Sequence, residues 1–176
     1  ELTRKCLEVL TYYKHSVSIL TKSCLVFRDI EILKKLKDIE VGFTITTAHD
    51  DIRKVFEPNA SSVENRFNAL EILSQNGIST WVFVAPLLPY FSDSDTALAQ
   101  IFESSQNAGA GQITFDSLNP YPVVWNKIIN LIRKFFPAVL DRYNYYYQNK
   151  TSYEKQIKSR IDKVGRKFKI KFDFAF

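Results

Sequence analysis

The apolar positions of the first 117 residues switch repeatedly between a helical period and a strand period. Apolar side chains three and four residues apart recur in four segments, residues 2–13, 29–36, 61–73 and 93–109. Short apolar runs, several rich in β-branched residues, lie between them at residues 16–22, 41–47, 81–85 and 112–116. Helix and strand therefore alternate with short connections, which predicts right-handed βαβ units, a parallel sheet and an α/β fold class.

Beyond Pro120 the pattern becomes mainly helical, with apolar stripes over residues 125–132 and 153–164. From Lys167 to Phe174 charged residues alternate strictly with aromatic or aliphatic ones, and Phe176 continues the apolar side of the pattern, as in a half-buried strand. Two Ser/Thr-x-x-Glu pairs, Ser61 with Glu64 and Thr151 with Glu154, predict helix N-termini. We divide the chain into an α/β domain over residues 1–125 and a helical extension with a terminal strand over residues 126–176.

The composition is that of an ordinary globular protein, with 45% apolar and 24% charged residues in 176. No run approaches the roughly 18 apolar residues of a membrane span, and no signal peptide opens the chain. We therefore expect a cytoplasmic protein with no membrane partner. Cys6 and Cys24 are too few for a disulfide framework or a metal knuckle, so we expect two reduced core thiols.

The net charge of +5 arises largely near the end of the chain, where basic residues concentrate between Lys150 and Lys171. We expect these basic residues to form a solvent-exposed face of the protein. The alternative is that they contact the phosphate backbone of a nucleic acid. The chain opens at Glu1 within a helical pattern and contains no methionine. We therefore expect it to be a fragment of a longer protein.

The polar residues of the predicted strands share one face of the sheet. By parity they are Ser18, Lys22, Gly42, Thr44, Thr46, Thr114 and Asp116, whereas the opposite face carries Val17, Ile19, Val41, Phe43, Ile45, Ile113 and Phe115. An apolar face suits covering helices, and a polar face suits the lumen of a partial barrel with ligands at the strand C-termini. The alternative is that these hydroxyl groups bond one another around buried water.

Lys22 is the most informative of these residues, because a cation at the end of a buried strand needs an anionic partner or a route to water. A ligand carboxylate or phosphate would supply the anion. Glu57 and Arg66 follow the second strand and either orient a zwitterionic ligand or bridge two elements of the fold. His15 and His49 have no ligand at metal-binding spacing, so we expect surface or capping roles for them.

A set of short motifs at successive strand ends resembles a known family. In chain order they are Leu20-Thr21-Lys22-Ser23, Phe27-Arg28-Asp29-Ile30, Phe43-Thr44-Ile45-Thr46-Thr47, Phe56-Glu57-Pro58, Arg66 and Val84-Ala85-Pro86. Over roughly residues 1–125 this order resembles the spore photoproduct lyase or DNA repair photolyase branch of the radical S-adenosylmethionine (SAM) superfamily. Glu1 resembles the acid that follows the second barrel strand of those proteins.

The resemblance implies the C-terminal part of a partial (β/α)6 barrel with four parallel strands retained. In the family, a 4Fe-4S cluster held by a CxxxCxxC loop reduces SAM to methionine and a 5′-deoxyadenosyl radical. That loop is absent here, so its cysteines are expected upstream of Glu1, with no catalytic residue and no metal ligand in this fragment. The implied cofactors are SAM and the cluster, and an electron-donor protein is an implied partner.

The site residues follow from the same resemblance. Lys22 resembles the lysine that meets the methionyl carboxylate, Thr44 stands in place of a serine near the ribose, and Ala85 lies where backbone approaches the nucleoside. Thr46, Glu57 and Arg66 fall in the matching region as further cofactor-binding candidates. The resemblance implies a lyase-like radical SAM enzyme whose substrate is open, with nucleic acid as a candidate, and we expect the fragment alone to be inactive. The alternative is a non-catalytic α/β module that binds nucleic acid through its basic C-terminal segment.

Overall fold

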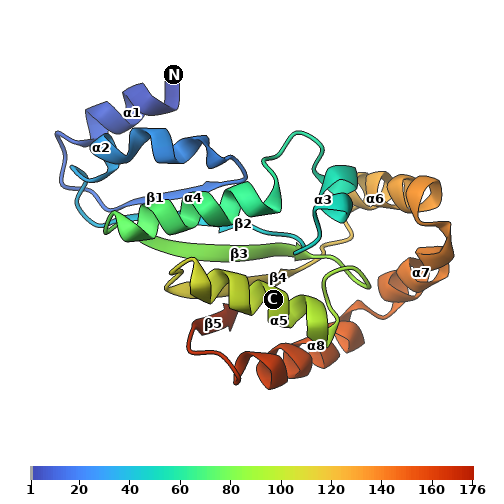
Figure 1. Ribbon diagram of the computed structural model, residues 1–176. Helices are drawn as coiled ribbons and strands as arrows, with labels where there is room; N and C mark the ends of the chain where they lie inside the picture. The colour runs from blue at the N-terminus through green and yellow to red at the C-terminus, as the bar shows by residue number, and fades with distance from the viewer. Residues whose placement is uncertain (1) are drawn as a thin grey trace.

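The computed structural model describes residues 2–176 and contains a single five-stranded sheet (Figure 1). The strands are β1 (Val17–Thr21), β2 (Ile39–Thr44), β3 (Ser79–Leu87), β4 (Gln112–Ser117) and β5 (Lys171–Phe174). Each strand pairs in parallel with the next in chain order. The predicted α/β class and parallel sheet are confirmed, and Glu1 lies outside the described residues.

Helices cover one face of this sheet and also extend beyond the ends of its strands. They are α1 (Leu2–Leu10), α2 (Ile30–Leu33), α3 (Asp50–Phe56), α4 (Val63–Gln75), α5 (Asp95–Asn107), α6 (Pro122–Phe135), α7 (Leu140–Gln148) and α8 (Lys150–Gly165), with 3-10 turns at Cys24–Asp29 and Pro137–Val139. In Figure 1, α4 and α5 lie in front of the sheet, and α3, α6 and α7 lie beyond the carboxyl ends of the strands. Among the described residues no helix is long and apolar enough to cross a membrane.

Along each strand, successive side chains point alternately to the face covered by helices and to the opposite face of the sheet. Phe43, Ile113 and Phe115 are fully buried in the main core, as the strand alternation predicts. On the other face, Gly42 makes room for the Trp81 indole, because a Cβ at Gly42 would lie 2.4 Å from Trp81 Cε2. The predicted apolar face is confirmed, and the opposite face carries the more polar and more exposed side chains.

The terminal strand β5 adds to the same sheet. Its residues Lys171–Phe174 pair with Gln112–Phe115 of β4. The Phe172 ring lies 5.4 Å from that of Phe102 on α5, so the strand is fixed by aromatic packing as well as by its ladder. The predicted half-buried strand is confirmed, although it is shorter than expected. The division of the chain at residue 125 stays a prediction.

Both predicted helix N-termini are wrong by one or two residues, because distant partners occupy the side chains concerned. Helix α4 is capped by Ser62, whose hydroxyl accepts from the Asn65 amide, while the Ser61 hydroxyl accepts from the Cys24 amide at 3.0 Å. Helix α8 begins after Asn149. The Glu154 carboxylate, expected to close a cap with Thr151, instead accepts from the Ser117 hydroxyl at 2.6 Å.

Candidate functional site

The carboxyl ends of β1, β2 and β3 bring the predicted site residues to one edge of the sheet. Lys22 directly follows β1, Thr44 is the last residue of β2, and Ala85 lies in β3 two residues beyond the Phe83 that pairs with Thr44. Parallel strands end on the same edge, where α/β proteins hold ligands. Thr46 was predicted inside the second strand, but β2 ends at Thr44, so Thr46 lies in the loop that leaves this edge.

Lys22, Glu57 and Arg66 form a continuous ion-pair relay from the surface into the core. Lys22 Nζ lies 2.7 Å from Glu57 Oε1, and Arg66 Nη2 donates to Glu57 Oε2 at 2.7 Å. The exposed fraction of the side chains falls from 44% for Lys22 to 7% for Glu57 and 0% for Arg66. Of the three, only Lys22 is open to a ligand.

The buried Arg66 guanidinium fixes the edge itself. Its Nη1 donates to the Thr44 carbonyl at 2.7 Å, at the point where β2 ends, and its Nε donates to the Ser61 carbonyl at 2.8 Å. These bonds satisfy carbonyl groups that the sheet ladder no longer reaches. Arg66 therefore connects β2, the loop before α4 and Glu57. Its guanidinium bonds groups of the protein and is not available to a ligand.

The relay leaves one net positive charge at the sheet edge. The Glu57 carboxylate sits between two cations, so it neutralises one of them and leaves the other uncompensated. An ammonium group has three donors, and Lys22 meets Glu57 Oε1 as an ion pair without the geometry of a hydrogen bond. Its donors are therefore available to an anion at this edge, and a carboxylate matches both the charge and the hydrogen-bonding capacity.

Both threonine candidates, Thr44 and Thr46, are buried. Thr44 is 5% exposed and Thr46 is 3% exposed. The Thr46 hydroxyl is buried without a hydrogen-bond partner among the described residues. Because an unpaired buried hydroxyl is costly, this atom fits a polar ligand group that enters the edge beside β2.

A family model supplies the decisive comparison. The model of the radical SAM superfamily matches residues 1–100, more than half of the chain. This chain belongs to the radical SAM superfamily. The predicted family is thereby confirmed, and the parallel sheet corresponds to part of a radical SAM barrel.

Two curated relatives match this radical SAM chain over different lengths. An uncharacterized protein of Methanocaldococcus jannaschii is 38% identical over 100 residues, which are 57% of this chain and 38% of that protein. An uncharacterized protein of Mycobacterium tuberculosis is 22% identical over 164 residues, which are 89% of this chain and 48% of that protein. The chain spans less than half the length of these relatives.

Solved structures share the fold over nearly the whole chain. Spore photoproduct lyase complexed with dinucleoside spore photoproduct has a TM-score of 0.70 at 14% identity, covering 98% of this chain and 55% of that one. Streptococcus suis SuiB bound to precursor peptide SuiA has a TM-score of 0.61 at 15% identity, covering 98% and 35%. At these identities the likeness shows the fold, which is that of a partial radical SAM barrel.

The residues of this radical SAM chain do not fit an iron-sulfur cluster. Residues 2–176 contain no group of three His, Cys, Asp or Glu side chains that could hold a metal ion. Cys6 is exposed on α1, so the prediction that it lies in the core is wrong, because it falls on the outer face of that helix. The Cys24 thiol is partly buried and accepts a hydrogen bond from the Ser61 hydroxyl at 3.4 Å. Residues 2–176 therefore do not supply the set of thiolates that binds an iron-sulfur cluster.

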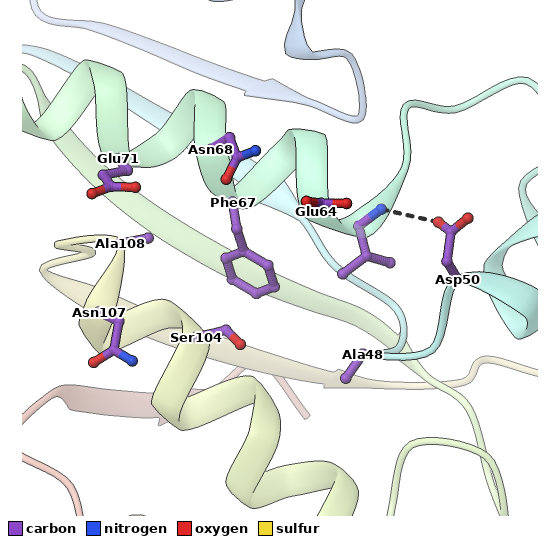
Figure 2. A pocket seen from close by; sticks show the side chains of 10 residues that line it. Ala48, Asp50, Glu64, Phe67, Asn68, Glu71, Ser104, Asn107 and Ala108 are labelled. Atoms are coloured by element: carbon purple, nitrogen blue, oxygen red, sulfur yellow. Dashed lines mark hydrogen bonds between the residues drawn. The ribbon is translucent and has the colours of Figure 1, made fainter.

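A separate cavity lies between α4 and α5 on the helical side (Figure 2). It measures about 500 Å³, and Phe67 points into it from α4. Glu64 and Glu71 stand along α4, and the Asp50 carboxylate accepts from the Val63 amide at 3.1 Å. None of the six predicted site residues lines it, so it is separate from the edge that Lys22 occupies.

Sequence reasoning missed Arg53 as a support of the site. Its side chain is 7% exposed, and Nη1 donates to the carbonyls of Glu57 at 3.1 Å and Ala60 at 3.0 Å. Its Nε lies 2.9 Å from the Asp50 carboxylate. This bond lowers the pKa of Asp50, and burial offsets only part of the decrease. The Asp50–Arg53 spacing of one helical turn was the only local signal. Arg53 shapes the loop that carries Glu57.

Proposed function

We propose that this chain forms part of the SAM-binding surface of a radical SAM enzyme. The observation that supports it is the Lys22–Glu57–Arg66 relay, which presents a single exposed cation where parallel strands end. In this proposal Lys22 donates to the methionyl carboxylate, and the Thr46 hydroxyl, which lacks a partner among residues 2–176, bonds a polar group of the ligand. Thr44 lies near the ribose, and the backbone at Ala85 approaches the nucleoside.

Glu57 and Arg66 act as positioning residues in this proposal. Arg66 holds Glu57 from within the core, and Glu57 holds Lys22 at the surface, so neither needs to touch the ligand. This arrangement limits the rotamer freedom that a lysine loses when it binds, and preorganisation of this kind favours affinity. Calorimetric titration of SAM into the complete protein tests the assignment, because binding that is indifferent to Lys22 would contradict it.

The chemistry of the whole protein is a proposal as well. The complete protein would be a radical SAM enzyme in which a 4Fe-4S cluster, held by residues other than those described here, would supply the electron for SAM cleavage. Nucleic acid is the candidate substrate, and an electron-donor protein is the proposed partner. A dinucleoside is bound by the spore photoproduct lyase that shares this fold, which supports the nucleic-acid candidate. The part of the reaction that we assign to this chain is binding and orientation of SAM.

The 176-residue chain on its own is expected to stay colourless and inactive after anaerobic treatment with iron and sulfide. Cys6 and Cys24 lie on separate elements, and no third ligand joins them among residues 2–176. The charge-transfer absorbance of an iron-sulfur cluster and the number of iron atoms per chain measure the outcome. A brown chain that cleaves SAM with a reductant would contradict this expectation.

Nucleic-acid binding through the C-terminal segment is the alternative function, and the structure limits its strength. Arg160 and Lys163 lie 3.5 and 3.7 Å from the Asp95 carboxylate, and Lys158 donates to the Phe176 carbonyl. Five other exposed cations of this segment form no side-chain bond within residues 2–176: Lys155, Arg166, Lys167, Lys169 and Lys171.

If this alternative holds, we expect the affinity for duplex DNA to fall steeply with salt. Neutralising about five phosphates gives a log–log slope of affinity against salt of roughly −4.5. Fluorescence anisotropy at several salt concentrations measures it, and the Arg166→Glu/Lys167→Glu double variant is expected to make the slope shallower by at least about 1.8. A slope near roughly −7 would mean that the Asp95 pairs open and that the whole segment binds the backbone. No binding at low salt would leave these residues as a solvated face.

A further inference from the structure

A second, smaller cavity lies between the loop after β3 and helices α7 and α8. Its volume is about 270 Å³, and its lining includes Tyr90, Asp93, Tyr145, Tyr153, Gln156 and Arg160. None of the six predicted SAM-site residues contributes to it. A cavity of this volume is below the usual size of a drug-like pocket and suits a small group.

Asp93 brings to this cavity a buried carboxylate that no cation bonds within residues 2–176. The residue is 6% exposed, and its Oδ2 accepts a hydrogen bond from the Tyr153 hydroxyl at 2.8 Å. Arg160, on the same lining, donates to the Asp93 backbone carbonyl at 2.8 Å and pairs with Asp95, so it does not bond the Asp93 carboxylate. Burying a carboxylate without a bonded cation is expensive. Asp93 therefore keeps acceptor capacity for a cation that enters the cavity.

Aromatic rings surround this carboxylate. Tyr90 adopts a φ of 67°, a left-handed conformation that is uncommon for a bulky residue and that often marks a functional site. The Arg142 guanidinium lies 5.3 Å from the centre of the Tyr90 ring, so one cation already packs on this wall. Burial, and then the charge of Asp93, raise the pKa of Tyr90. Tyr90 therefore stays a neutral phenol, and the face of its ring attracts cations.

We propose that this cavity binds a small organic cation that carries N–H donors, a guanidinium or ammonium group. The cation pairs with Asp93, and its apolar part packs on Tyr90 and Tyr145 while Gln156 bonds its remaining polar edge. The proposal is independent of SAM binding, since the two sites share no residue. The cation belongs either to a free small molecule or to an arginine or lysine side chain of a peptide.

Calorimetric titration with propylguanidinium and with its neutral isostere propylurea tests the proposal. We expect propylguanidinium to bind at least about tenfold more tightly, since one charge-assisted bond has that effect. Asp93→Asn should remove the difference. Tyr153→Phe, which deletes the structural bond but keeps the charge, should retain it. Asp141→Asn, at an exposed acid of α7 that forms no side-chain bond within residues 2–176, serves as the control.

Equal affinities for the two probes, or a difference that survives Asp93→Asn, would overturn the proposal. The comparison of probes needs no variant, so it decides the matter even where Asp93→Asn fails to fold. Acetyl-Gly-Arg-Gly-amide distinguishes the sources of the cation. Binding as tight as that of propylguanidinium supports a peptide side chain, and exclusion of the peptide supports a free small molecule.

Discussion

Replacing Arg66 by alanine is expected to lower the free energy of unfolding by about 3–5 kcal/mol, the usual cost of removing one partner of a buried ion pair. The guanidinium is fully buried and bonds the Glu57 carboxylate and the carbonyls of Thr44 and Ser61. Its loss leaves these three acceptors without their donor, and Glu57 keeps only the half-exposed Lys22. Urea denaturation followed by circular dichroism measures the change.

Two further variants distinguish the effect of the buried charge on stability from the effect of replacing any helical arginine by alanine. Arg133→Ala removes an arginine whose side chain bonds only Asn130 on the exposed side of α6, and it should change stability by less than about 0.5 kcal/mol. The Glu57→Gln/Arg66→Met pair removes both charges and should cost less than Arg66→Ala alone, because no buried charge is left unpaired. A loss below about 1 kcal/mol for Arg66→Ala would show that the relay does not hold the edge together.

The positions of the strands and the faces of their side chains could be predicted from the sequence, because both depend on local pattern. Alternation along a strand decides which side chains share a face, so the burial of Phe43, Ile113 and Phe115 could be predicted from parity alone. The addition of β5 beside β4 could not be predicted. Strict alternation in the last residues indicates a half-buried strand, but its partner lies about 60 residues earlier, and local pattern carries no information on such pairing.

The candidate site shows the same limit. Lys22, Glu57 and Arg66 could each be singled out from residue type and position, yet whether they meet a ligand or one another depends on contacts across 35 and 9 residues. The structure brings the three together. The misplaced caps have a similar cause, because Glu154 finds Ser117 across 37 residues instead of its neighbour Thr151. Long-range partners thus override local preferences at these positions.

Replacing Lys22 by alanine in the complete, cluster-loaded protein is expected to weaken SAM binding roughly ten- to hundredfold. A charge-assisted hydrogen bond contributes about 1.5–3 kcal/mol, and about 1.4 kcal/mol corresponds to tenfold in affinity. Stability should change by less than about 1 kcal/mol, because the Lys22 side chain is 44% exposed and Glu57 keeps its bond to Arg66. Calorimetric titration with SAM and a melting curve of the same sample measure both quantities.

The separation of affinity from stability is what distinguishes a ligand-binding lysine from a structural one. If Lys22 only neutralises Glu57, Lys22→Ala lowers the melting temperature and reduces SAM binding merely in proportion to the folded fraction. Lys34→Ala is the matched control, since Lys34 is an exposed lysine that bonds Asn76 at 2.8 Å, and it should leave the affinity for SAM unchanged. Unaltered affinity in a folded, cluster-loaded Lys22→Ala protein would remove Lys22 from the site, and the carboxylate would then need a different cation at this edge.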